Sequence, residues 1–123
     1  MKIKRYQAKA GDGINKSTLK RINTFFSTPQ DAITEALYLK EKMDSKYEKH
    51  IQWDFDAKIT GSMEKVKILK GYLNGDRKTH PFYLEILSSE QKKDTPIASP
   101  LKNKKSFTNK ELKMIENVGL LFQ

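Results

Sequence analysis

Hydrophobic residues recur every three or four positions between residues 29 and 50, which is the period of an amphipathic helix. The stripe consists of Ala32, Ile33, Ala36, Leu37, Leu39, Met43 and Tyr47. Thr28 is a suitable N-cap, and Pro29 then falls at the first helical position, where its missing N–H costs nothing. Counting from Ser27 instead gives a Ser-x-x-Gln capping box at nearly the same place. The pattern predicts a helix from Pro29 to His50 that packs across a sheet.

From Ile51 the period changes from 3.6 to two. Apolar Ile51, Trp53, Phe55, Ala57 and Ile59 alternate with polar Gln52, Asp54, Asp56, Lys58 and Thr60. This alternation predicts a strand over residues 51–60 with one buried and one solvated face. The single tryptophan lies on the apolar side, so we expect it to pack under the long helix.

Two further segments are predicted to be strands, over residues 64–73 and 81–88. In the first, Val66, Ile68 and Tyr72 alternate, although Val66, Leu69 and Leu73 also fit a helical stripe. The Asn74-Gly75 dipeptide favours the strand, because it is a turn signal of hairpins. In the second, apolar side chains alternate with Tyr83 and Glu85 on the opposite face. We therefore expect three antiparallel strands.

The N-terminal residues are less regular. Residues 1–10 alternate in part and are predicted to form an edge strand, where lysines discourage association. Gly11-Asp12-Gly13 is predicted to be a turn, and it lacks the spacing of a phosphate-binding glycine loop. Residues 17–26 fit a helix face or a strand, and the β-rich end of this segment favours the strand.

The C-terminal third combines an extended segment with a helix. Residues 89–107 are rich in lysine and contain two prolines, which indicates a basic linker. Thr108-x-x-Glu111 is a capping box, and apolar residues follow at helical spacing, which predicts a helix from Asn109 to Leu120. The expected organisation is an α+β core over residues 1–88, a linker over 89–107 and a helix within 108–123. The expected fold is a mostly antiparallel sheet with the long helix on one face.

Composition adds a strongly basic character. The net charge is +9, and residues 1–26 carry seven basic side chains against one acidic one. Such a field attracts polyanions. The absence of cysteine excludes disulfides and thiol nucleophiles. No apolar run reaches the ~20 residues of a membrane span, and no apolar segment follows the basic N-terminus. We expect a cytoplasmic protein, with secretion by a signal-independent route as the alternative.

Candidate catalytic chemistry is sparse. Asp54 and Asp56 lie two apart on the predicted strand and are weak candidates for a shared metal ion, although a solvated sheet face is the favoured interpretation. Asp56-Ala57-Lys58 resembles the acid-x-Lys strand motif of restriction-like nucleases, which implies metal binding and water activation, but their further acidic residue has no counterpart here. His50 and His80 form no metal motif, and no nucleophile elbow is present. We expect no cofactor and favour a non-catalytic protein.

Basic residues interleave with aromatic ones in several places, a combination that binds phosphates and stacks on bases. The sequence contains no RNP, GXXG or zinc-finger signature. The candidate nucleic-acid contacts are Lys2, Lys4, Arg5, Lys20, Arg21, Arg77, Lys78, His80, Lys104 and Lys105. The predicted function is a small binding module for nucleic acid. The alternatives are a protein-interaction module (an inhibitor, adaptor or secreted effector) for an acidic protein partner, and a nucleotide- or metal-dependent activity.

Overall fold

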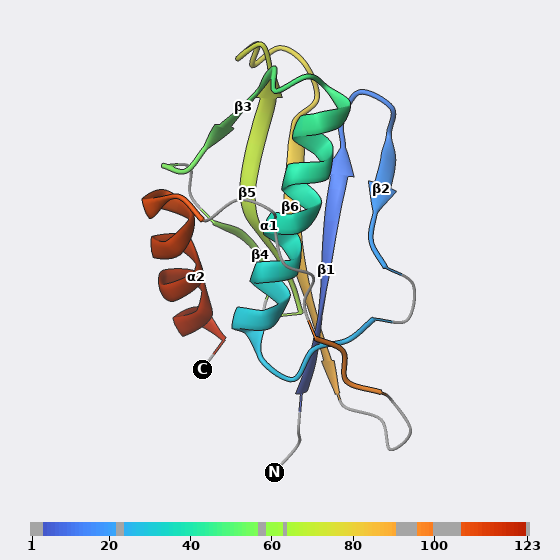
Figure 1. Ribbon diagram of the computed structural model, residues 1–123, viewed down its shortest axis with the longest axis vertical. Coiled ribbons are helices and arrows are strands. Elements are labelled where there is room, and N and C mark those ends of the chain that lie inside the picture. Colours follow the sequence, from blue (N-terminus) through green and yellow to red (C-terminus); the bar gives the residue numbers. More distant parts are fainter. Residues whose placement is uncertain are drawn as a thin grey trace.

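A six-stranded antiparallel sheet with two helices forms the α+β fold of the computed structural model (Figure 1). The structure describes residues 4–21, 24–56, 59–62, 64–90, 96–99 and 107–122. The elements are β1 (Lys4–Asp12), β2 (Ser17–Leu19), α1 (Pro29–Lys46), β3 (Ile51–Asp54), β4 (Thr60–Ser62), β5 (Lys65–Leu73), β6 (Phe82–Glu90) and α2 (Asn109–Leu121). The predicted fold class is confirmed.

The strands lie in the order β2-β1-β6-β5-β3, and β4 pairs with the same outer edge of β5 as β3 does. The strand predicted over residues 51–60 is therefore wrong in its extent. The ladder of β3 stops at Asp54, whose Oδ1 accepts a hydrogen bond from the backbone N–H of Asp56 at 3.0 Å. This side-chain turn competes with strand pairing. Ile59, predicted on the buried face, is exposed.

The N-terminal strand is not at an edge of the sheet, contrary to the prediction. β1 lies between β2 and β6, and its register with β6 runs from Lys4 opposite Glu90 to Gly11 opposite Tyr83. It also continues through Asp12, so the turn begins at Gly13 rather than at Gly11. Pairing between strands so far apart in the sequence is non-local, and local patterning carries no signal for it.

The long helix begins where predicted. The Thr28 side chain accepts a hydrogen bond from the backbone N–H of Asp31 at 3.1 Å. The helix ends at Lys46 instead of His50, because Glu48 and Lys49 adopt positive φ angles of 54° and 63°, which an α-helix does not accommodate. The predicted apolar stripe is buried from Ala32 to Met43. Trp53 packs against this core, and its Nε1–H donates to Asp44 of α1 at 2.7 Å.

The short C-terminal helix and its capping box are confirmed. The backbone N–H of Glu111 donates to Thr108 Oγ1, and the backbone N–H of Thr108 donates to Glu111 Oε1. Met114 and Val118 then complete the hydrophobic core. Within residues 17–26, a strand forms only over Ser17–Leu19, at the opposite end from the one whose composition favoured it. Phe26 makes an isolated bridge to Tyr6, and residues 22 and 23 lie outside the described residues.

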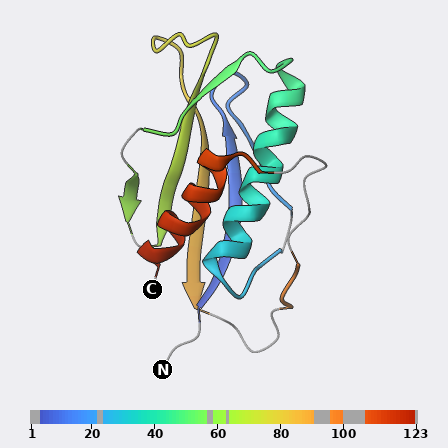
Figure 2. The same cartoon turned by 60° about the vertical axis from the view of Figure 1, so that its left-hand side comes forward.

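Both helices lie on the same face of the sheet (Figure 2). Beneath them, alternate residues of the central strands form the core, from Tyr6, Ala8 and Ala10 of β1 to Phe82, Leu84 and Ile86 of β6. The intervening residues point to the opposite face, which neither described helix covers. We call this second surface the open face. Neither of the two described helices combines the length and the apolar character needed to cross a lipid bilayer.

Candidate nucleic-acid interface on the open sheet face

The open face gathers basic and aromatic side chains from strands far apart in the sequence. Cross-strand pairing places Lys9 beside Glu85, Lys67 on the other side of Glu85, and Lys70 beside Tyr83. Its charged and aromatic members within the described residues are Arg5, Lys9, Phe25, Asp54, Lys65, Lys67, Lys70, Tyr72, Arg77, Tyr83 and Glu85. Among these described residues, six basic side chains face two carboxylates, so the surface is positively charged.

A β-bulge in β5 enlarges this basic surface. The register shifts between Lys67 and Leu69, and Ile68 and Leu69 are both buried. The extra residue brings Lys70 and Tyr72 to the same face as Lys65 and Lys67. Simple alternation put Tyr72 on the apolar side with Val66 and Ile68, and that prediction is wrong for this physical reason.

Three cation–aromatic pairs lie on the open face. The Arg5 guanidinium carbon is 3.9 Å from the centroid of the Phe25 ring. Lys67 Nζ is 4.7 Å from the centroid of the Tyr83 ring. The Arg77 guanidinium carbon is 5.0 Å from the centroid of the Tyr72 ring. All three rings are half-buried, whereas Phe26 and Phe82, the neighbours of Phe25 and Tyr83 in the chain, belong to the core.

Glu85 is the buried anion of this face. Its side chain is 2% exposed, and Oε1 lies 3.2 Å from Lys9 Nζ and 4.0 Å from Lys65 Nζ. The shorter contact holds Lys9 close to the sheet. The Lys65 side chain is 58% exposed, so its ammonium group remains accessible to an anion in solvent. One carboxylate therefore organises two strands without neutralising the surface.

A shallow hollow of roughly 360 Å³ opens on this face between β4, β5 and β6. It is lined by Thr60, Gly61, Ser62, Lys65, Lys67, Tyr83 and Glu85. The Tyr83 ring lies over Gly11 of β1, where any added Cβ would overlap the ring. Gly11 therefore allows the Tyr83 ring to pack against the sheet backbone beside the hollow.

The predicted contact residues divide between the two faces. Arg5 and Arg77 belong to the open face, and Lys78 and His80 are exposed in the loop that carries Arg77. Lys4 and Lys20 are exposed at strand ends. Lys2, Lys104 and Lys105 lie outside the described residues. The predicted contacts do not include Lys9, Lys65, Lys67 or Lys70, although the alternation of Lys65 and Lys67 with apolar residues is visible in the sequence.

Arg21, another predicted contact, is engaged on the helical side. Its Nε donates to Glu35 Oε2 at 2.6 Å, and its Nη2 donates to Glu35 Oε1 and to the carbonyl of Ser99. Glu35 is 2% exposed. This charge-assisted, two-pronged contact stabilises the buried carboxylate, so Arg21 has a structural role.

The two weak metal candidates, Asp54 and Asp56, are neighbours, and Asp54 pairs with an arginine. Asp54 Oδ2 is 3.1 Å from Arg77 Nη2, and Asp54 Oδ1 accepts the Asp56 N–H. Ala57 and Lys58, which complete the nuclease-like motif, are outside the described residues. Within the part of the chain that the structure describes, no three His, Cys, Asp or Glu side chains gather closely enough to hold an ion.

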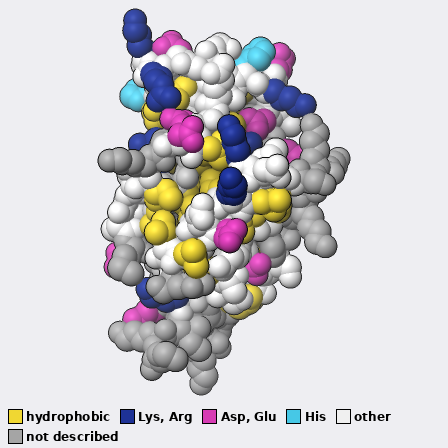
Figure 3. Space-filling model, turned by 90° about the vertical axis from the view of Figure 1, so that its left-hand side faces the viewer, with side chains coloured by type: hydrophobic (Ala, Val, Ile, Leu, Met, Phe, Trp, Pro, Cys, Tyr) yellow, Lys and Arg dark blue, Asp and Glu magenta, His cyan; other side chains and the backbone are white. Residues whose placement is uncertain are grey.

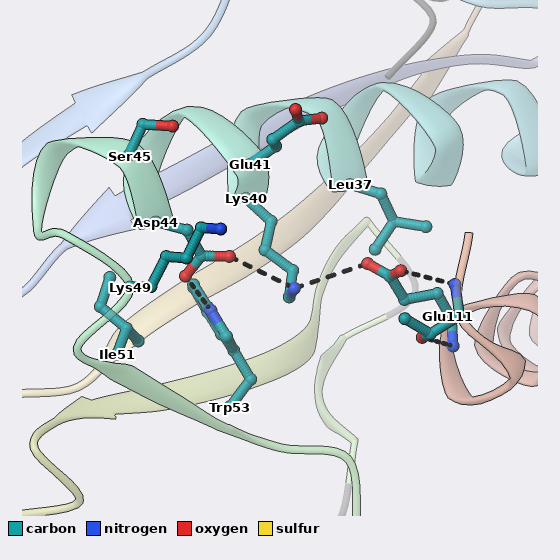
Figure 4. Close-up of a pocket in the computed structure, with 10 residues that line it drawn as sticks. Leu37, Lys40, Glu41, Asp44, Ser45, Lys49, Ile51, Trp53 and Glu111 are labelled. Carbon is teal, nitrogen blue, oxygen red and sulfur yellow. Dashed lines mark hydrogen bonds and ion pairs between the residues drawn. The ribbon is translucent and has the colours of Figure 1, made fainter. Parts of the chain in front are cut away.

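A second pocket, of roughly 400 Å³, lies between α1, β3 and the N-terminus of α2 (Figure 4). Lys40 extends across it, with Nζ 3.4 Å from Asp44 Oδ2 and 3.5 Å from Glu111 Oε2. Asp44 also accepts the Trp53 hydrogen bond. These contacts join α2 to α1 and β3, so the cluster stabilises the docking of the C-terminal helix.

A third polar cluster closes the end of the sheet where β1 turns. Asp12 is buried and accepts hydrogen bonds from Tyr47 Oη at 2.6 Å and Lys46 Nζ at 3.1 Å, as well as from the backbone of Ile14 and Asn15. Burial opposes ionisation of Asp12, but these hydrogen bonds together outweigh it and lower its pKa. Burial and the neighbouring Asp12 carboxylate raise the pKa of Tyr47 to about 12.

The outer side of α2 is apolar, with Leu112, Leu120 and Leu121 exposed. Figure 3 shows hydrophobic side chains gathered in the middle of this side of the molecule. Nothing in the described structure indicates what covers them. The open face, with its charge and its defined contacts, is the stronger candidate site.

Known proteins give no guide to the function. No family model matches the chain, and no curated protein or solved structure matches it either. The chemistry of the open face is therefore the basis for assigning a function.

Proposed function

We propose that the protein is a non-catalytic binding module that takes up nucleic acid on its open face. The observation that carries this proposal is the concentration of six basic side chains and three half-buried rings on the sheet surface that neither described helix covers. Lysine and arginine neutralise phosphates, and this term supplies much of the affinity for nucleic acid.

The rings distinguish this proposal from simple attraction to an acidic protein. A cation over an aromatic ring contributes about 0.5–1 kcal/mol at an exposed site. A base stacked on the same ring contributes about 1–3 kcal/mol. Exchange of the cation for a base is therefore favourable, and the released cation can contact the adjacent phosphate. Antiparallel sheets with surface aromatics bind RNA in this way in RNA recognition motifs, which provides a physical precedent.

The test is a fluorescence anisotropy titration of labelled oligonucleotides at several salt concentrations. The open-face variant Lys65→Gln/Lys67→Gln/Lys70→Gln is compared with the control Lys16→Gln/Lys42→Gln/Lys113→Gln, whose exposed lysines belong to other surfaces. Both variants lose three charges from the native +9.

We expect the wild-type affinity to fall steeply with salt. In the open-face variant, the slope of log affinity against log salt should decrease by about two to three, since each phosphate contact contributes about 0.7–0.9. The control should keep most of the wild-type slope. Equal losses in the two variants would contradict the proposal, and binding only to an acidic protein would favour the interaction-module alternative.

A further inference from the structure

The hollow between β4, β5 and β6 has the chemistry of a site for one nucleotide unit. We infer that the open face selects single-stranded over double-stranded nucleic acid, with a base stacked on Tyr83 and its phosphate held near Lys65 and Lys67. This inference rests on the proposed function and specifies its ligand. Tyr83 lies at the rim of the hollow.

Tyr83 is fixed in place by the strand beside it. Its ring lies over Gly11, the cross-strand partner of Tyr83 in β1. The ring occupies the space where the Cβ of any larger residue at position 11 would lie. Since the ring rests on backbone, it offers a firm platform and loses little freedom when a base stacks on it. A rigid aromatic surface of this kind accepts any base, because every base has a π-face.

The other walls of the hollow carry hydroxyl and ammonium donors for a phosphate, and the Glu85 carboxylate that also lines it is buried and paired with Lys9 at 3.2 Å. Thr60 and Ser62 supply hydroxyl groups from β4, and Lys65 supplies an exposed ammonium group from the paired strand. Between them Gly61 has a φ of 125°, and an added Cβ would overlap the Lys65 carbonyl. This close approach brings the hydroxyls of β4 and the lysine of β5 to the same small area, where hydroxyl and ammonium donors can share one anion.

Tyr72 provides a second stacking position. Lys70 is the register partner of Tyr83, and Tyr72 lies two residues further along the same face. Such diagonal neighbours are about 7–8 Å apart, so successive bases of an unstacked strand can reach both rings. Lys67 and Arg77 now lie over these rings, and their long side chains can turn toward the phosphates as the bases enter.

A duplex cannot use these positions. Its bases are stacked on one another and paired, so their faces are unavailable to a tyrosine without unpairing. Single-stranded and double-stranded nucleic acid can both contact the lysines through their phosphates. Strand selectivity should therefore depend on the rings, whereas the salt dependence should depend on the lysines.

The experiment measures the affinity for a single-stranded oligonucleotide and for the matching duplex at one salt concentration. Tyr83→Leu and Tyr72→Leu remove the rings, and Tyr83→Phe and Tyr72→Phe are the matched controls that keep them. We expect each leucine variant to lose about five- to 150-fold in single-strand affinity. The phenylalanine variants should stay close to wild type, and duplex affinity should change little in any of them.

The outcomes separate this inference from the proposed function. Absence of salt-sensitive binding to either oligonucleotide overturns both. Salt-sensitive binding that is equal for duplex and single strand, or unaffected by both leucine substitutions, leaves the proposed function standing and overturns the stacking site. Melting temperature and Trp53 emission report folding. If Tyr83→Leu unfolds because the Gly11 contact is lost, the comparison of Tyr72→Leu with Tyr72→Phe tests the stacking site.

Discussion

The two faces of the sheet use the same strands for different purposes. Along β6, Phe82, Leu84 and Ile86 are fully buried beneath the helices, whereas Tyr83 and Leu87 are half-buried on the open face. A two-residue period therefore divides one strand between a hydrophobic core and a charged surface. The stability of the fold and the proposed binding should therefore be separable, because each depends on a different set of alternate side chains.

Substitutions on the two faces of β6 should differ most in their effect on stability. Leu84→Ala should lower the free energy of unfolding by about 2–5 kcal/mol, because it leaves a cavity in the core. Leu87→Ala, the same substitution on the open face, should cost about 1 kcal/mol or less, because its site is partly solvated. Urea denaturation measures both. Similar costs at the two positions would show that the open face is covered in solution.

A smaller effect on stability is expected at the end of the sheet, where Asp12 is buried on the helical side. Tyr47→Phe removes the hydrogen bond to Asp12 and should lower the free energy of unfolding by about 1.5–3 kcal/mol at pH 7. Because the folded pKa of Tyr47 is raised from 10.0 to about 12, its stabilising effect is present below pH 10 and is lost as the pH rises through 12.

Denaturation at pH 7, 10 and 11.5 tests this assignment, with Tyr38→Phe, a tyrosine within α1, as the control. Tyr47→Phe should show a smaller alkaline loss than wild type. An unchanged alkaline loss would refute the role of Tyr47.

At acid pH the dependence of stability on pH has the opposite sign. The lowered pKa of Asp12 stabilises the fold above its ordinary value of 3.8, and this contribution disappears as the pH falls through the folded pKa.

Local patterns in the sequence predict local elements well. The Thr28 and Thr108 caps mark both helix starts, since capping depends on residues three positions apart. The alternation of Phe82, Leu84 and Ile86 likewise predicts which face of β6 is buried. These signals are short in range, so one sequence is enough to detect them.

The candidate site depends on features that local patterns do not contain. β1 is central because it pairs with the distant β6, and the bulge after Lys67 reverses the side on which Tyr72 lies. Only pairing of β5 with β6 brings Lys70 beside Tyr83. The sequence indicates a basic, aromatic surface, but the residues that form it can be identified only from the register of β1, β5 and β6.

The most direct test follows the ring resonances of the five tyrosines by NMR while a single-stranded oligonucleotide is added. Tyr72 and Tyr83 belong to the open face, Tyr6 is buried in the core, and Tyr38 and Tyr47 belong to α1 and its end. If bases stack on the open face, we expect large shifts for Tyr72 and Tyr83, caused by the ring currents of the stacked bases, and small shifts for the other three. Shifts confined to Tyr38 or Tyr47, or unchanged signals from Tyr72 and Tyr83 in a saturated complex, would contradict binding on the open face.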